Sequence, residues 1–291
     1  MTPQAVKVDR PIFVVGNSRS GTWMMHGVLG RHPTVAMQTL EQKWVWKYGH
    51  YDDVSDRLTP EQATPKIVAY IRRFFENYQR EAGPGRRVGE KTNDNALRLK
   101  YIAHVFPDAK IVHMLRDGRA SAVSSARYWQ KPFTPQYRKI FHVPLGMKFR
   151  LVGSYFWRKI KRCFGQKVAA PWGPCFPGIE RAMKERSLIE LCGMQWRYVV
   201  QTARAEGAEL GPDRYYECRY ERFCAEPVPV LAELLAFLEL PPSEEVEQWV
   251  AANVHTQAVD AWKKHISDEE LDKLMAEIEP TLRECGYLDG E

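Results

Sequence analysis

The sequence lacks the features that mark several large protein classes. None of its apolar runs approaches the roughly 18 residues that a membrane-spanning helix needs. The segment from Met1 to Asp9 has no apolar core of the kind found in signal peptides. The six cysteines include no CxxC pair and the eight histidines no HxxxH or HxH pair, so neither a zinc site nor a dense disulfide framework is indicated. We therefore expect a cytoplasmic protein with reduced thiols.

Charge is nearly balanced, and the small excess is basic. The chain carries 42 lysines and arginines against 36 aspartates and glutamates, which gives a net charge of +6 at pH 7. This excess favours an anionic partner such as a nucleotide, an acidic polymer or a lipid headgroup, and charge alone does not choose among them. With 44% hydrophobic residues and no internal repeat, residues 1–291 are predicted to fold as a single domain.

Short apolar runs alternate with segments of helical periodicity. Helices are predicted at 21–30, 65–82, 93–106, 227–240 and 268–285, with another starting near Asp117. Strands are predicted at 11–15, 87–90, 110–115 and 214–219. This alternation is typical of an α/β fold with three α/β/α layers and a central parallel sheet.

The segment at about 129–179 departs from this alternation. It contains several prolines and many aromatic residues, which is typical of an irregular insertion. We interpret it as a helical, aromatic-rich lid over the sheet edge. Some of its aromatic residues are candidates for the wall of an acceptor cleft, although core residues would look the same in sequence: Trp129, Phe133, Tyr137, Trp172 and Phe176.

Residues 145–163 of this insertion form a basic amphipathic pattern. Leu145, Phe149 and Phe156 recur at helical spacing, and lysines and arginines surround them. Two interpretations stay open. The segment either makes peripheral contact with a membrane surface or packs its apolar stripe on the domain as a lid, and we favour the lid.

A glycine-rich loop lies between the first predicted strand and helix. Residues 16–22 read GNSRSGT, which keeps the glycine spacing of a P-loop but places Thr22 where ATP-binding loops have lysine. Backbone N–H groups and the helix terminus would face an anion, and Arg19 adds a planar donor suited to phosphate or sulfate. The alternative is a tight turn without a ligand. Because the lysine and a Walker-B aspartate are lacking, a triphosphate and Mg²⁺ are not required.

The chain resembles the sulfotransferase family in several segments. The run PIFVVGNSRSGT at 11–22 is similar to the family's 5′-phosphosulfate loop, and Glu90-Lys91-Thr92 to its Glu-Lys-Thr element. The run from His113 to Ser121, with Ser124 behind it, resembles the 3′-phosphate element. Further similarities follow at 219–223 (RYERF) and 262–265 (WKKH), so the resemblance spans about residues 11 to 287.

The resemblance implies a P-loop-like fold and a donor, 3′-phosphoadenosine 5′-phosphosulfate, without metal. It implies that Arg116 and Ser124 bind the 3′-phosphate and that Tyr220 contacts the nucleotide. Lys91 and Arg19 would act on the leaving phosphate, because such transfer depends on alignment and charge neutralisation. The predicted loop contacts to the donor are Asn17, Ser18, Arg19, Ser20, Gly21, Thr22 and Trp23.

The acceptor hydroxyl also needs a general base. Cytosolic family members have histidine directly after the Lys-Thr pair, but this chain has Asn93, which does not titrate near neutral pH. Other members, including the protein-tyrosine branch, use a glutamate soon after a His-Pro pair. Here Glu41 follows His32-Pro33 and is the candidate base, with Asp94 in reserve. An ordinary glutamate, with a pKa of about 4.3, is ionised but weakly basic.

The resulting hypothesis is transfer of a sulfuryl group to a hydroxyl of a lipid, glycan or small alcohol. A hydrophobic or glycosylated acceptor is expected, and no nucleic acid. Two alternatives stay open: a P-loop kinase-like phosphotransferase that uses ATP and Mg²⁺, and a non-catalytic nucleotide-binding scaffold. The presence of Arg19, Lys91 and Arg116 argues against the scaffold.

Overall fold

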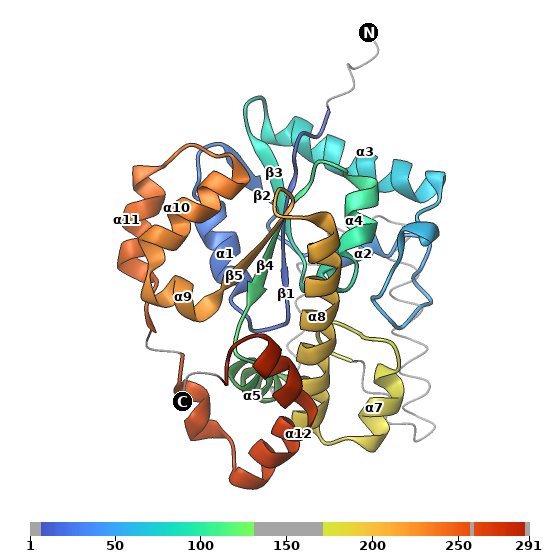
Figure 1. The fold of residues 1–291 in the computed structure, drawn as a ribbon. Coiled ribbons are helices and arrows are strands. Elements are labelled where there is room, and N and C mark those ends of the chain that lie inside the picture. Colours follow the sequence, from blue (N-terminus) through green and yellow to red (C-terminus); the bar gives the residue numbers. More distant parts are fainter. Residues whose placement is uncertain (1–6, 131–170, 257–258, 289–291) are drawn as a thin grey trace.

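A single parallel sheet forms the centre of the molecule. The computed structural model describes residues 7–130, 171–256 and 259–288 (Figure 1). Within these ranges the strands pair in the order β2-β3-β1-β4-β5, and every pairing is parallel. The predicted α/β fold with a parallel sheet is confirmed. The strands are β1 (Ile12–Gly16), β2 (Val35–Met37), β3 (Arg87–Lys91), β4 (Lys110–Leu115) and β5 (Tyr215–Arg219).

The central strands are apolar because helices cover both faces of the sheet. All residues of β1 and β4 are buried, as expected for parallel strands. Phe13 and Val15 pack with Trp46 on one face, whereas Ile12 and Val14 join a different cluster on the other. This alternation follows the two-residue period of a strand. Alternate residues of one strand therefore pack in two separate hydrophobic cores.

The helices divide between the two faces (Figure 1). The first core contains residues of α2 (Lys43–Trp46), α3 (Pro65–Ala82), α4 (Leu99–Val105) and α8 (Leu188–Leu210). The second contains residues of α1 (Thr22–Leu29), α9 (Tyr220–Ala225), α10 (Pro227–Leu238) and α11 (Glu244–Asn253). A third core joins α8 to α5 (Gly118–Trp129) and α12 (Asp268–Glu284), and α7 (Ile179–Glu185) packs against α8. The described residues also contain short 3-10 helices at η1 (Pro60–Gln62), η2 (Asn93–Leu97) and η5 (Ala261–His265).

The strand register brings three loops to one edge of the sheet. Val14 pairs with Lys91 of β3, and Gly16 pairs with Met114 of β4. The carboxyl ends of β1, β3 and β4 therefore lie side by side and point toward α5 in the lower half of Figure 1. In open α/β sheets, ligands bind outside this edge. The glycine-rich loop, the Lys91 segment and Arg116 meet there.

Some elements differ from the sequence prediction. The three-residue strand β2 was not predicted, because so short an edge strand has no measurable periodicity. The predicted helix at 93–106 begins as η2 and continues as α4, with a non-helical backbone (φ −155°, ψ 43°) at Arg98 between them. Residues 131–170 lie outside the described residues, and with them Phe133, Tyr137 and the predicted basic helix at 145–163.

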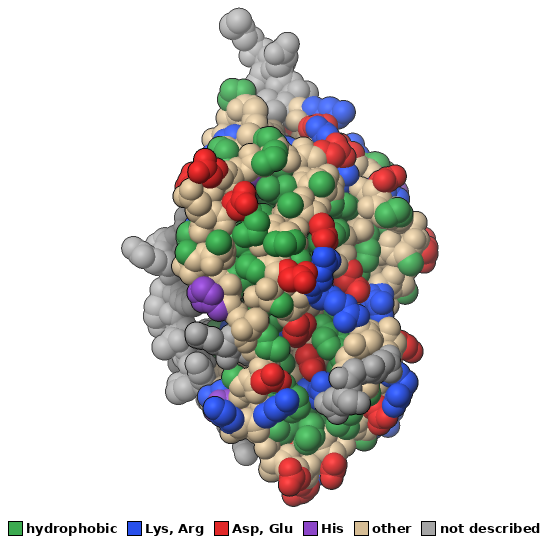
Figure 2. Space-filling model, turned by 60° about the vertical axis from the view of Figure 1, so that its left-hand side comes forward, with side chains coloured by type: hydrophobic (Ala, Val, Ile, Leu, Met, Phe, Trp, Pro, Cys, Tyr) green, Lys and Arg blue, Asp and Glu red, His purple; other side chains and the backbone are tan. Residues whose placement is uncertain are grey.

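The excess of lysine and arginine residues is not concentrated on the face formed by α9, α10 and α11. Figure 2 shows acidic and basic side chains interspersed with apolar ones there. The first turn of α11 is acidic, with Glu244, Glu245 and Glu247. Within the described ranges, no helix is both long enough and apolar enough to cross a membrane.

Candidate functional site

The glycine-rich loop turns directly from β1 into α1. Gly16 and Gly21 both have positive φ angles, 146° and 88°, and Gly21 is the N-cap of α1. A Cβ atom at Gly21 would lie 2.6 Å from Cδ2 of Tyr220. The turn therefore requires glycine for its backbone conformation and for its close contact with the ring. It directs the first backbone N–H groups of α1 out of the sheet edge, where an anion can bind.

Hydrogen bonds fix the loop to α5. The Ser18 carbonyl accepts from the Ser121 and Ser125 hydroxyls, at 3.1 and 3.3 Å. The Asn17 amide donates to the Ser121 Oγ atom at 3.0 Å, and Ser20 Oγ lies 3.4 Å from the same atom. Asn17, Ser18 and Ser20 are all buried. The side chains of Asn17 and Ser20 therefore hold the loop in place, so only their backbone N–H groups would be available to bind an anion.

Arg19 and Arg116 lie on the α5 side of the loop. Arg19 is exposed, has a φ of 70°, and donates from Nε to the Ser124 hydroxyl at 3.1 Å. Arg116 donates to the Arg19 carbonyl at 2.9 Å, and its guanidinium carbon lies 4.3 Å from the centre of the Tyr220 ring. The structure thus brings together Arg19, Arg116, Ser124 and Tyr220. This arrangement provides two cations and a hydroxyl beside the turn into α1.

Lys91 and Glu41 form a direct ion pair on the other side of the loop. The Lys91 Nζ atom is 2.5 Å from Glu41 Oε1, and its side chain is only 1% exposed. The ammonium also lies 3.7 Å from the ring centre of Trp23, whose side chain is 50% exposed. Burial lowers the pKa of Lys91, and attraction to Glu41 opposes this shift only in part. Arg19 contacts the α5 side instead, so its shared role with Lys91 stays a prediction.

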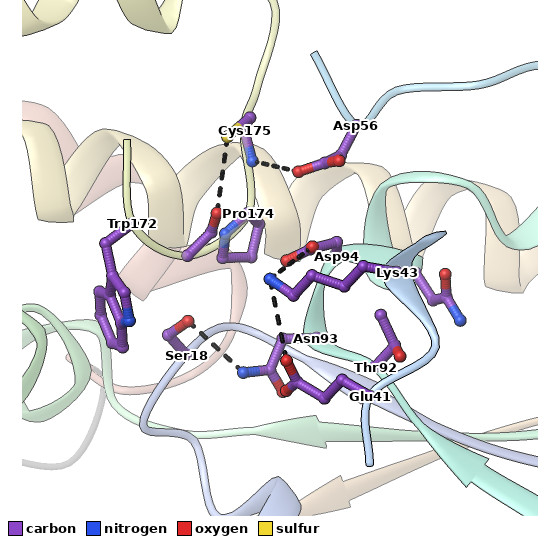
Figure 3. Close-up of polar contacts among 12 residues, drawn as sticks. Ser18, Glu41, Lys43, Asp56, Thr92, Asn93, Asp94, Trp172, Pro174 and Cys175 are labelled. Carbon is purple, nitrogen blue, oxygen red and sulfur yellow. Dashed lines mark hydrogen bonds and ion pairs between the residues drawn. The ribbon is translucent and has the colours of Figure 1, made fainter. Parts of the chain in front are cut away.

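A second lysine extends this ion pair into a row of alternating charges, of which Figure 3 shows Asp94, Lys43 and Glu41. Lys43, the first residue of α2, places Nζ 2.6 Å from Asp94 Oδ2 and 3.8 Å from Glu41 Oε2. Burial lowers the pKa of Lys43, but attraction to Asp94 and Glu41 outweighs it and raises the pKa above its ordinary value. Sequence reasoning missed Lys43, because a lysine two residues after a glutamate in a loop carries no pattern.

The buried carboxylate of Glu90 connects the two segments that carry these charges. It accepts hydrogen bonds from Gln42 N (3.1 Å), Trp46 Nε1 (3.3 Å), Asn95 Nδ2 (3.1 Å) and the Thr92 hydroxyl. Burial raises the pKa of Glu90 to about 7, and these donors oppose the shift because they favour the ionised form. Glu90 thereby holds the loop before α2 against η2.

Asn93 connects the glycine-rich loop to the same cluster. Its amide oxygen accepts from the Thr22 hydroxyl at 2.8 Å, and its amide nitrogen donates to Ser18 Oγ at 3.4 Å. Figure 3 shows Asn93 between Ser18 and Glu41. Asn93 therefore lies inside the site even though its amide does not titrate.

The segment after residue 170 forms a wall beside the loop. Gln195 Nε2 donates to the carbonyls of Trp172 and Pro174, at 2.8 and 3.0 Å. A Cβ atom on Gly173 would lie 3.0 Å from Ser18 Oγ, so this backbone passes against the glycine-rich loop. The rings of Trp172 and Tyr128 have centres 4.7 Å apart. Trp129 lies 6.2 Å from Trp172 and packs partly buried against two hydrophobic cores, so a place for these two residues in the wall of an acceptor cleft stays a prediction.

Phe176 is not part of that wall. It is 2% exposed and stacks on Tyr198, with ring centres 4.5 Å apart. It belongs to the small core beneath α7 and α8. The prediction of a cleft position for Phe176 was wrong, because the apolar character of a residue does not distinguish core from pocket.

Comparison with known proteins connects this geometry to one family. Residues 11–150 match the model of the sulfotransferase family. The chain is 22% identical over 310 residues to a protein-tyrosine sulfotransferase of Drosophila melanogaster, covering 95% of this chain and 51% of that protein. It is 31% identical over 134 residues to protein-tyrosine sulfotransferase 1 of Danio rerio, covering 42% of this chain and 37% of that protein. The chain thus spans about half the length, or less, of these relatives.

Solved structures share the fold. The sulfotransferase domain from the curacin biosynthetic pathway superposes with a TM-score of 0.55 at 14% identity, covering 94% of this chain and 98% of that one. Sulfotransferase STF9 from Mycobacterium avium gives 0.54 at 13% identity, covering 95% of this chain and 77% of that one. The chain is thus similar in sequence to the sulfotransferase family over residues 11–150, the part that holds the glycine-rich loop, Lys91 and Arg116, and it shares the fold of solved sulfotransferases.

Proposed function

We propose that the protein transfers the sulfuryl group of 3′-phosphoadenosine 5′-phosphosulfate to the hydroxyl of an acceptor. The observation that carries this proposal is the Lys91–Glu41 ion pair of 2.5 Å, placed at the sheet edge beside the glycine-rich loop. It combines a cation for the leaving oxygen with a carboxylate for the acceptor proton. The match of residues 11–150 to the sulfotransferase family supports the same reaction.

The donor would bind across the loop from α1 to α5. Its 5′-phosphosulfate suits the backbone N–H groups of the turn into α1, and its 3′-phosphate suits Arg116 and Ser124. Arg19 lies between these regions, since it contacts Ser124 through its side chain and Arg116 through its carbonyl. Charge-assisted hydrogen bonds from arginine are the strong contacts that a bisphosphate nucleotide requires.

In the reaction, the acceptor oxygen forms a bond to sulfur as the bond from sulfur to the bridging oxygen breaks. Lys91 donates a hydrogen bond to the bridging oxygen, which leaves with 3′-phosphoadenosine 5′-phosphate, and Glu41 takes the acceptor proton. Lys91 therefore exchanges its contact with Glu41 for one with the leaving group. This exchange frees a carboxylate at the moment when a base is needed.

We further propose that the acceptor hydroxyl is phenolic. The relatives named above are protein-tyrosine sulfotransferases. The half-exposed Trp23 indole beside Lys91 offers a flat apolar surface at the reacting groups. A phenol, with a pKa of about 10, also gives its proton to a carboxylate more readily than an aliphatic alcohol does. Lipid and glycan alcohols are the competing acceptors.

Calorimetric titration tests the donor site without an acceptor. We expect binding of 3′-phosphoadenosine 5′-phosphate, loss of that binding in Arg116→Ala, and no comparable response to ATP with Mg²⁺. Tight ATP binding without a bisphosphate response would instead favour a kinase-like phosphotransferase. Transfer assays with a simple phenol and a matched aliphatic alcohol then test the acceptor class, and faster sulfation of the alcohol would refute the phenolic proposal.

A further inference from the structure

We propose that Lys43 is a positioning residue that holds the Glu41 carboxylate during the reaction, and that Asp94 fixes Lys43 for this purpose. This inference rests on the proposed function, in which Glu41 is the base. It assigns a role to a lysine outside the predicted site and gives Asp94 a role other than reserve base.

The contacts place Lys43 on the second oxygen of Glu41. Lys91 contacts Oε1 at 2.5 Å, whereas Lys43 lies 3.8 Å from Oε2. Asp94, which is 2% exposed, binds Lys43 at 2.6 Å through Oδ2 (Figure 3). The strongest contact of Lys43 is therefore with the buried carboxylate. This contact sets where its ammonium lies relative to the base.

The backbone beneath Lys43 is also fixed. The preceding residue, Gln42, donates its N–H toward the buried Glu90 carboxylate and Thr92 Oγ1, each at 3.1 Å. Both ends of the Lys43 side chain are thus held, the backbone end by β3 and the ammonium by η2. A lysine usually loses considerable rotamer entropy when it is held in one place, and here much of that entropy is already lost in the free protein.

The proposed reaction needs such a residue because Lys91 cannot serve two groups at once. When Lys91 donates to the bridging oxygen, Glu41 loses its closest cation just before it accepts a proton. Lys43 remains within reach of Oε2 and keeps the carboxylate oriented. Asp94 neutralises Lys43, so the pair orients Glu41 without adding net positive charge beside it.

The charges that face this group come from three elements. Lys91 and Glu90 face Glu41 from β3, Lys43 faces it from α2, and Asp94 faces Lys43 from η2. Asp56 also attracts Lys43. Removing the Lys43 cation favours the protonated Glu41 carboxyl. Removing the Asp94 anion leaves Lys43 free to stabilise the ionised carboxylate. The two substitutions therefore have opposite effects on the protonation of Glu41.

The test compares Lys43→Met with Asp94→Asn, and uses Lys43→Arg as the conservative variant. The acid limb of the kcat/KM profile should move up by about one pH unit in Lys43→Met and move down in Asp94→Asn. Turnover should fall at least tenfold in Lys43→Met and recover in part in Lys43→Arg, while bisphosphate affinity stays unchanged. The double variant Lys43→Met/Asp94→Asn leaves no unpaired buried charge, and its limb should lie above that of Asp94→Asn alone.

Lys47→Met is the matched control. Lys47 lies one turn further along the chain, donates to the Asp53 and Ser55 carbonyls at 2.9 and 2.6 Å, and places Nζ 4.0 Å from Asp56 Oδ1. The Lys47→Met substitution should leave the acid limb of the kcat/KM profile unmoved. An unmoved limb in Lys43→Met, or equal loss of rate at every pH in both single variants, would overturn the inference by reducing Lys43 to a structural role.

Carbon-13 NMR of the glutamate carboxyls separates this inference from the proposed function. The Glu41 signal is identified by its absence in Glu41→Gln, and it is followed against pH in the free protein. A higher titration midpoint in Lys43→Met supports the positioning role even if no sulfuryl transfer is found, an outcome that would refute only the function. An unchanged midpoint overturns the role whatever the activity.

Discussion

Replacing Glu90 with glutamine tests how strongly the site depends on a buried anion. The two side chains have nearly the same shape, but glutamine stays neutral at every pH. Burial raises the pKa of Glu90 to about 7 from its ordinary value of 4.5. The folded protein therefore holds the Glu90 proton in a pH range where the unfolded chain has already lost it.

The sign and size of the effect follow from linkage. Between pH 4.5 and 7 the folded state binds the more protons at this position, so its stability falls as pH rises. A difference of about 2.5 pKa units corresponds to about 3 kcal/mol. Glutamine does not titrate, so the contacts that it loses cost the same at every pH. The stability of Glu90→Gln relative to the unsubstituted protein should therefore rise by about 3 kcal/mol between pH 4.5 and pH values above 7.

The same substitution should lower activity. The glutamine amide would place its N–H groups where the Glu90 carboxylate accepts hydrogen bonds. The affected donors are either Gln42 and Thr92 or Trp46 and Asn95. At least one of these contacts is lost, and the loop that carries Glu41 shifts. We expect turnover to fall at least tenfold. Urea unfolding at pH 5 and pH 8 and acceptor assays measure both effects, and a stability difference that is the same at both pH values would refute the reasoning.

Four other predictions concern the donor and the acceptor. Lys91→Ala and Arg19→Ala should each lower turnover at least tenfold in steady-state assays without unfolding the protein, and unchanged rates would remove that residue from the mechanism. Glu41→Gln should keep bisphosphate binding in calorimetry but suppress transfer, and retained activity would transfer the role of base to another group. Gly21→Ala should destabilise the protein by about 1–3 kcal/mol in thermal unfolding, because φ is 88° and the new methyl meets Tyr220, whereas wild-type stability would contradict the strained turn. Trp23→Ala should raise KM for a phenol more than for an aliphatic alcohol, and equal changes would exclude stacking on Trp23.

Much of the fold could be predicted because its determinants are local. The runs that form β1 and β4 are continuous and apolar, as buried parallel strands must be, and both were predicted within a residue of their bounds. The helix α8 was not predicted, although the capping box of Ser187 and Glu190 marked its start. The capping box is therefore a local sequence signal for the start of α8.

The site could be predicted only in part. The glycine spacing at 16–21 indicated the turn into α1, the Glu-Lys-Thr element indicated Lys91, and the position after His32-Pro33 indicated Glu41. The contact between Arg19 and Ser124 and the row from Asp94 through Lys43 to Glu41 could not be predicted. These contacts join residues brought together by the sheet register and by the path of the loop before α2, and neither leaves a periodic pattern in the sequence.

The hydrogen bonds between the glycine-rich loop and α5 have a consequence for how donor affinity is distributed. Ser121 and Ser125 hold the Ser18 carbonyl, and Arg116 holds the Arg19 carbonyl. The ordering entropy of the loop is therefore lost when the protein folds and not when the nucleotide arrives. The separation between the turn into α1 and Arg116, the two regions proposed to bind the phosphates of the donor, is fixed in the same way. If the donor binds as proposed, nucleotides with a different spacing between their phosphates would have to deform α5, and the interior of a helix would determine cofactor selectivity.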